Sequence, residues 1–143
     1  MKHAAPAVVA TLTAAALLIT GPAAAAPNTS DLPPVLTQGA VKYMSGGIGA
    51  DEEATMRSEM AKYPLSLEFA ERASPLPEHL AGINVTIRDQ SGKTELDAIS
   101  DGPFMLVQLP AGKYQVTADV DGKMQTRDVV VAANKPEHVF FEW

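Results

Sequence analysis

The residues with the clearest potential for chemistry in this sequence are two histidines, His79 and His138. Imidazole binds zinc and copper, and methionine sulfur could complete a soft site. Two histidines without a carboxylate at a fixed spacing carry little specificity for a metal, however. A solvated loop histidine and a strand-edge histidine are the simpler interpretation, so we predict no metal.

A glycine-rich segment at Gly46, Gly47 and Gly49 precedes a helical pattern, and the amides at a helix start attract phosphate. The segment matches neither the P-loop nor the dinucleotide fingerprint, and the three acidic residues at 51–53 would repel a phosphate. A tight turn is the simpler interpretation.

The stretch Asp119 to Gly122 resembles a fragment of a calcium loop, but the remaining ligand positions are missing. A β-hairpin explains it better. No G-x-S-x-G or S-x-x-K motif occurs, and the absence of cysteine excludes thiol nucleophiles and thiolate zinc sites. The sequence therefore predicts no cofactor and no enzymatic activity.

A short helix is expected within residues 41–64, after the glycine-rich turn. Asp51 suits the helix N-cap, and Glu53 and Arg57 can pair at i,i+4. Met56, Met60 and Tyr63 fall on one narrow arc at helical spacing. We expect this arc to pack on the rest of the protein, with a groove for a partner as the alternative.

From Leu65 onward the hydrophobic period changes to two, which is typical of half-buried strands. Seven strands are expected, at Leu65–Ala70, Ile83–Arg88, Thr94–Ile99, Phe104–Gln108, Tyr114–Val120, Met124–Val131 and His138–Trp143. No crossover helix separates them, so we predict antiparallel pairing in two packed sheets.

Two turns in this region have specific signatures. Asp121 and Gly122 between alternating runs predict a type I′ two-residue hairpin. The segment LPAGKY, from Leu109 through Pro110 and Gly112 to Tyr114, indicates a tyrosine corner, in which the tyrosine hydroxyl bonds backward to the main chain. Together these features predict a mainly β, seven-stranded antiparallel Greek-key β-sandwich with one short N-terminal helix.

The stretch INVTIRDQSGKTELDAISDG, followed by Phe104 and LPAGKYQVTADVDGK, resembles the carboxypeptidase regulatory-like domain of the transthyretin-like, or prealbumin-like, sandwiches. The resemblance covers residues 80–143. The matching turn and core positions are Gly82, Gly92, Asp101, Phe104, Leu109, Pro110, Gly112, Tyr114 and Val116. The segment Tyr43 to Arg57 is also similar to the front part of small uncharacterised exported bacterial proteins that carry such a domain.

The resemblance implies an accessory, structural or interaction module rather than a set activity. Enzymes of this architecture require residues that the chain lacks. Hydroxyisourate hydrolases need a Tyr-Arg-Gly-Ser type terminus, whereas this chain ends in FFEW. Intradiol dioxygenases need two tyrosines and two histidines around iron, and the mature chain offers only His79 and His138, one in a predicted loop and one at a strand start. A metallocarboxypeptidase domain would not fit within the remaining length.

Residues 1–25 have the pattern of a secretory signal peptide, with Lys2 and His3 before an apolar run and small residues at the end. Residues 26–40 read as a flexible leader, with a binding arm as the alternative. Without the signal peptide, ten Lys and Arg face seventeen Asp and Glu, a formal charge of −7. We expect an exported protein, periplasmic or extracellular, with no stable membrane insertion and no nucleic-acid partner.

Two functions remain open at this point. The first is an exported structural or protein-interaction module of the bacterial cell envelope, with an envelope protein as partner. The second is the binding of a small ligand, namely carbohydrate, on exposed aromatic rings. The candidate interaction face comprises Tyr43, Met56, Met60, Tyr63 and Trp143. Exposed, coplanar Tyr43 and Trp143 would favour the carbohydrate binder, whereas a buried Trp143 beside an uncovered apolar edge would favour a protein partner.

Overall fold

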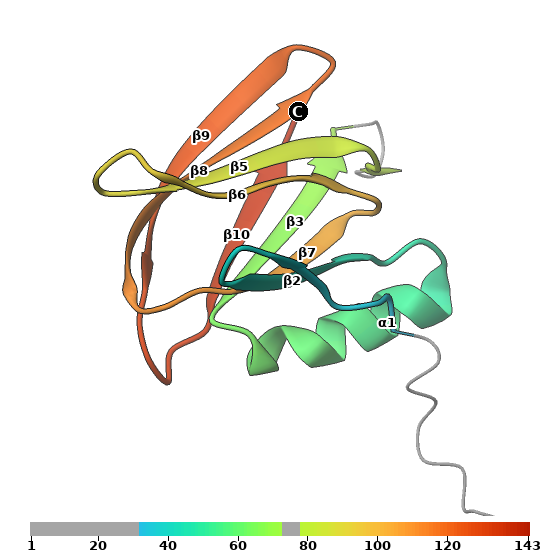
Figure 1. Cartoon of the computed structure of the whole chain (residues 1–143). Helices are drawn as coiled ribbons and strands as arrows, with labels where there is room; N and C mark the ends of the chain where they lie inside the picture. The colour runs from blue at the N-terminus through green and yellow to red at the C-terminus, as the bar shows by residue number, and fades with distance from the viewer. Residues whose placement is uncertain (1–31, 73–77) are drawn as a thin grey trace, which may run out of the picture.

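The computed structural model describes residues 32–72 and 78–143, which form two β-sheets and one α-helix (Figure 1). Sheet A has the strand order β1 (Leu36–Gln38), β2 (Val41–Gly46), β7 (Phe104–Gln108), β3 (Leu65–Glu71) and β10 (Glu137–Glu142), and the two-residue β4 (Glu78–His79) also pairs with β3. Sheet B has the order β6 (Thr94–Ser100), β5 (Ile83–Asp89), β8 (Gly112–Val120) and β9 (Lys123–Val131). The protein is therefore mainly β and has the architecture of a sandwich.

The main hydrophobic core lies between the two sheets. It takes the inward-facing residues of alternating strands from both sheets, for example Phe69 and Phe141 from sheet A and Val85 and Ile87 from sheet B, all fully buried. The rings of Phe69 and Phe141 stack with centroids 5.6 Å apart. This core follows directly from the period-two patterning of the sequence.

A second, smaller core lies on the other side of sheet A, under helix α1 (Ala50–Glu59) (Figure 1). Met56 of the helix is fully buried against Met44 of β2 and against Phe104 and Leu106 of β7. Met60 and Tyr63 pack at its margin, where a 3₁₀ turn, Met60–Lys62, follows the helix. The molecule thus has three layers: helix, sheet A and sheet B.

The prediction of seven strands was wrong, because β1, β2 and β4 are present as well. All seven expected strands occur, as β3 and β5 to β10. Part of the predicted leader forms β1, which pairs with β2. Strand β2 itself was not predicted; it ends at Gly46, and the residues from Gly47 to Gly49 form the loop before the helix. Sequence periodicity misses β2 because Tyr43 faces one core and Met44 the other, so no polar alternation remains.

The prediction that all strands pair antiparallel was also wrong, because β10 runs parallel to β3. The chain leaves β9 in sheet B and crosses to sheet A through residues 132–136. The amide of Glu137 then donates to the carbonyl of Pro64 at 2.9 Å, so β10 begins beside the start of β3 and runs along it in the same direction.

Asp51 does not cap the helix, contrary to the sequence expectation. The N-cap is Gly49, with φ at 91° and no side-chain cap, and Asp51 lies in the first turn. Glu52 instead reaches back, and its Oε1 accepts a hydrogen bond from the amide of Gly47 at 2.7 Å. A Cβ at Gly47 would collide with the ring of Phe104. The loop is packed against its own helix and against sheet A.

The hairpin between β8 and β9 has the geometry of a type I′ turn. Asp121 and Gly122 have φ of 50° and 83°, and Val120 lies opposite Lys123. At the preceding corner, the hydroxyl of Tyr114 donates to the carbonyl of Pro110 at 2.7 Å. These two turns fix the register and position of β8, the central strand beside β9.

Candidate functional site

The outer face of the four-stranded sheet B is covered by no described element, and we call it the open face. In Figure 1, α1 lies beyond sheet A, on the side away from sheet B. The outward side chains of the open face are Asn84, Thr86, Arg88, Asp97, Ile99, Lys113, Gln115, Thr117, Asp119, Met124, Thr126, Asp128 and Val130. Its centre is a row of hydroxyls from Thr86, Thr117 and Thr126, and its margins are apolar.

Three exposed apolar side chains lie at these margins. Ile99 on β6 is 57% exposed, and Met124 and Val130 on β9 are 64% and 57% exposed. Met124 and Ile99 belong to one cross-strand row, which runs through Asn84 and Asp119. Oδ1 of Asp119 is shielded from solvent and accepts no hydrogen bond in the part of the chain that the structure describes.

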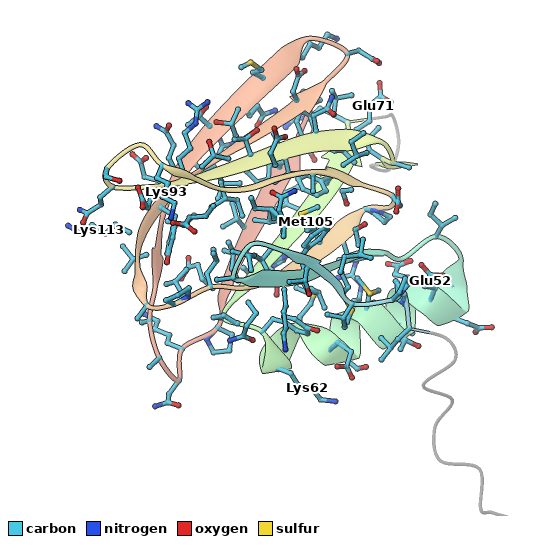
Figure 2. The ribbon with its side chains drawn as sticks, viewed as in Figure 1. Glu52, Lys62, Glu71, Lys93, Met105 and Lys113 are labelled. Carbon is cyan, nitrogen blue, oxygen red and sulfur yellow. The ribbon has the colours of Figure 1, made fainter. Side chains whose placement is uncertain are left out.

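A groove of about 530 Å³ lies at one end of the open face. Arg88, Lys113, Gln115, Asp128 and Val130 line it, together with the β5–β6 turn. Figure 2 shows Lys93 and Lys113 at this end of the molecule. Because two cations and the carboxylates of the turn and of Asp128 share the groove, it has no single sign of charge.

The carboxylate of Asp89 holds the β5–β6 turn in shape. Its Oδ1 accepts hydrogen bonds from the hydroxyl and amide of Ser91 and from the amide of Lys93, at 2.6, 2.9 and 3.0 Å. These bonds, the one from the Ser91 hydroxyl first, hold the pKa of Asp89 below its ordinary value. The turn that borders the groove is therefore well defined.

Strand β9 forms a long free edge beside the open face. In a two-residue hairpin the closing pair, here Val120 and Lys123, is hydrogen-bonded, and bonded pairs then alternate along the ladder. The amide and carbonyl groups of the even-numbered residues, Met124, Thr126, Asp128 and Val130, therefore point away from β8. Among the described strands β9 pairs only with β8, so the other edge of this nine-residue strand has no neighbouring strand. The carbonyl of Thr126 on this edge accepts from the guanidinium of Arg127 at 3.2 Å.

The edge of β6, at the opposite side of sheet B, is closed by side chains. The side-chain amide of Gln38 forms two hydrogen bonds with the backbone of Asp97. Its Nε2 donates to the Asp97 carbonyl at 2.9 Å, and its Oε1 accepts from the Asp97 N–H at 2.6 Å. Just after β6, the hydroxyl of Ser45 accepts from the amide of Asp101 at 3.0 Å. Gln38 thus caps the β6 edge at one residue, Asp97, as a paired residue of a neighbouring strand would.

The edge of β10 is short and partly closed. Nε2 of Gln125 donates to the carbonyl of Glu142 at 2.6 Å, and the indole of Trp143 donates to the carbonyl of Lys123 at 2.8 Å. The guanidinium of Arg127 lies over the ring of Phe141, 5.3 Å from its centroid. These contacts join the margins of the two sheets and leave β9 as the longest free edge that the structure describes.

The five residues predicted as an interaction face do not form one surface. Met56 is fully buried, and Met60 and Tyr63 are half-buried against the helix core. Tyr43 and Trp143 are half-buried against the main core from β2 and from the end of β10, which lie at opposite ends of sheet A. Trp143 also stacks on Phe141, at 6.1 Å between ring centroids.

One set of polar residues on sheet A has the composition of a hydrolytic triad. Ser66 and Glu68 lie on β3, and His138 on β10 places its Nε2 3.1 Å from Oε2 of Glu68. The hydroxyl of Ser66 is directed to the carbonyl of Met60, however, and the residue is 1% exposed. A serine closed off from substrate is not a nucleophile, so this cluster is structural.

Arg57 completes that cluster from the helix. Its guanidinium lies 3.0 Å from both Glu53 and Glu68 and over the ring of Phe104. Burial acts to lower the pKa of Arg57, but the hydrogen bonds and charges of the two glutamates outweigh it, so the pKa is raised. Arg57 therefore fastens the helix to the buried carboxylate of sheet A.

The described residues contain no group of three or more His, Asp or Glu side chains arranged to hold a metal. The side chain of His79 and the predicted signal peptide lie outside what the structure describes. No described helix is both long and apolar enough to cross a membrane. No protein-family model and no curated protein matches this chain.

Sequence reasoning did not select the β9 residues or Phe140, which is 44% exposed on the outer side of β10. A signal was present for Phe140, because two consecutive phenylalanines in one strand must face opposite sides. Met124 and Val130 also break the alternation of β9 by standing at outward positions. Apolar residues at outward strand positions are thus the sequence signal of an exposed contact surface.

Proposed function

We propose that this protein is a non-enzymatic module of the bacterial cell envelope, exported to the periplasm or the cell exterior, that binds another envelope protein. The binding surface in this proposal is the free edge of β9 together with the adjoining margin of the open face. The proposal keeps the carboxypeptidase regulatory-like resemblance as its fold assignment, since such domains serve mainly as accessory and interaction modules.

The observation that carries the proposal is the contrast between β9 and the other strand edges. Gln38 caps the backbone of Asp97 on the edge of β6, whereas no described strand pairs with the nine-residue edge of β9, which carries exposed Met124 and Val130. On that edge the carbonyl of Thr126 accepts a hydrogen bond from the guanidinium of the neighbouring Arg127 at 3.2 Å, so a side chain and not a strand occupies it. A long edge with apolar side chains is the surface to which an extended segment of a partner adds as a further strand. Backbone bonds would supply affinity, and Met124 and Val130 would supply apolar contact.

The alternative function, carbohydrate binding on an aromatic platform, has less support. Tyr43 and Trp143 are half-buried and lie on different margins of sheet A, so they offer no common plane to a sugar ring. All eight aromatic residues of the chain lie in the described part, and the outward residues of the open face include none of them.

The experiment is crosslinking in intact envelopes with the protein as bait, followed by mass spectrometry, on the wild type and two variants. Asp128→Pro removes an edge amide that does not bond β8 and should abolish capture of the partner with little change in folding. Asp128→Ser removes the same carboxylate, keeps the amide and should retain the partner.

Three results would contradict the proposal. These are no partner captured by the wild type, equal capture by the Asp128→Pro variant, or crosslinks that map to the helix side. A dimer of the protein that the same proline substitution dissociates would instead identify a second copy of this chain as the occupant of the edge.

A further inference from the structure

A cleft at the end of the sandwich, next to the last turn of the helix, has no part in the proposed function. Its volume is about 440 Å³, within the range of small-molecule sites. Three segments form it: the 3₁₀ turn Met60–Lys62, the β7–β8 connection at residues 109–111 and the β9–β10 loop at residues 132–136. Figure 2 shows Lys62 at this end of the molecule.

The walls of the cleft are held in place by the fold. Leu109 and Val131 are 3% and 2% exposed, so each adjoining loop starts from a residue anchored in the main core. The hydroxyl of Tyr114 holds the carbonyl of Pro110, and the amide of Glu137 holds that of Pro64. The cleft is therefore preformed, which reduces the entropy lost when a ligand binds.

The charge of the cleft is opposite to that of the chain. Two of its lining residues are cationic, Lys62 and Lys135, and none is acidic, although the chain has a formal charge of −6. Nζ of Lys62 is held 2.7 Å from Oε1 of Glu59, whereas Lys135 forms no ion pair with the described residues. The cleft thus offers an available ammonium group beside a second one that is partly neutralised.

The uncharged lining suits an organic molecule rather than a bare inorganic anion. Tyr63, Gln108 and Asn134 provide a ring, a hydroxyl and two amides, and Pro64 and Pro136 provide apolar surface. Burial, and then the charge of Glu59, raises the pKa of Tyr63, so its hydroxyl stays protonated and can donate near neutral pH. Apolar walls with a few convergent polar groups are typical of small-molecule sites.

We infer that this cleft binds a small organic carboxylate, with the carboxylate beside Lys135 and Lys62 and the neutral body against Tyr63, Gln108 and Asn134. Such a carboxylate could belong to an acidic sugar or to an aliphatic acid, and the two share the recognition of the charged group. The inference does not depend on the β9 edge, so each can fail without the other.

The test is a titration of the ¹⁵N-labelled protein with glucuronate, hexanoate and glucose, followed by NMR amide shifts. Glucuronate, hexanoate or both should cause saturable shifts at Tyr63, Ala111 and Lys135, and glucose should not. Binding of glucuronate alone would assign the site to acidic sugars, and binding of hexanoate alone to aliphatic acids.

Lys135→Gln should weaken the binding about tenfold. Lys113→Gln, which removes the same charge at the groove of the open face, is the matched control and should leave the affinity unchanged. Each of the following would overturn the inference: no saturable shift up to about 10 mM of either carboxylate, equal shifts with glucose, or equal weakening by the two lysine substitutions.

Discussion

The outer faces of the two sheets differ in what covers them. On sheet A, strands β3 and β7 are buried on both sides, because Met56 of α1 packs on Leu106 and Phe104. On sheet B, the corresponding outward positions carry threonines and charged residues, and no described element lies over them. The same chain therefore builds one face that is completed internally and one that remains available for contact.

The largest difference in stability should appear between two single variants that place an aspartate on one face each. Met56→Asp buries a carboxylate under the helix and should cost about 4 kcal/mol or more of unfolding free energy. Val130→Asp places that carboxylate on the open face, opposite Lys113, and should change stability by less than about 0.5 kcal/mol. Urea unfolding measures both.

If the Met56→Asp variant does not fold, Met56→Ala should still fold and lose about 2–5 kcal/mol. Equal costs for the two aspartate variants would show that the helix does not cover sheet A in solution, and the comparison between the faces would be lost.

The buried carboxylate of sheet A gives the next largest effect. Glu68→Gln removes the charge that binds both Arg57 and His138 and should cost about 2 kcal/mol, since the glutamate side chain is only 8% exposed. Glu59→Gln removes the pair between the end of α1 and Lys62 of the 3₁₀ turn. Because the Lys62 side chain is 68% exposed, this loss should cost less than about 0.5 kcal/mol. Thermal unfolding measures both variants, and equal losses of unfolding free energy would contradict this ranking.

The tyrosine corner, which serves sheet B, should contribute about 1 kcal/mol. Tyr114→Phe removes the hydroxyl that donates to Pro110 and leaves the ring in place. Tyr43→Phe is the control in sheet A, because the described residues supply no hydrogen bond to that hydroxyl. Denaturant midpoints should fall for the first variant only, and a neutral result for Tyr114→Phe would remove the corner as a stabilising contact.

On the open face, one substitution should increase stability. Asp119→Thr removes a carboxylate whose Oδ1 is shielded and accepts no hydrogen bond from the described residues, and it adds a β-branched side chain beside Asn84. We expect a gain of about 0.5 kcal/mol in the unfolding free energy. A loss of stability would mean that this carboxylate has a stabilising partner in solution.

The smallest effect concerns the turn that borders the groove. Because the pKa of Asp89 is depressed, its bonds stabilise the folded state above the ordinary pKa of 3.8 and are lost as pH falls through the depressed value. The amide shifts of Ser91 and Lys93 should titrate with a midpoint below 3.8, and Asp89→Asn should abolish this titration. A midpoint at or above 3.8 would contradict the assigned hydrogen bonds.

The sequence predicted sheet B better than sheet A, for a physical reason. The strands of sheet B alternate because one face meets the core and the other meets water, and the Asp121–Gly122 turn sets their register. In β2, Tyr43 and Met44 face different cores, so alternation is absent and the strand was not predicted. The parallel pairing of β10 depends on the path of the loop after β9, which brings β10 beside the start of β3. No local sequence pattern predicts that path.

The candidate surface was predictable in part. Outward Met124 and Val130 could have been found from the predicted Asp121–Gly122 hairpin, whose register places them opposite Asp119 and Lys113 on the polar face of β8. The closure of β6 by Gln38 could not, because that contact joins residues that are far apart in the sequence and depends on how the sheets are stacked.

The parallel pairing of β3 with β10 has a consequence for the order of folding. Phe69 on β3 stacks on Phe141 of β10, and the two strands are separated by most of the sandwich in sequence. Until β10 has been made, the main core lacks Phe141 and one edge of β3 has no paired strand. A chain that folds as it emerges must wait for β10, and long-range closure of this kind is slow. Folding should therefore behave as one late, cooperative step that C-terminal truncation before Phe141 prevents.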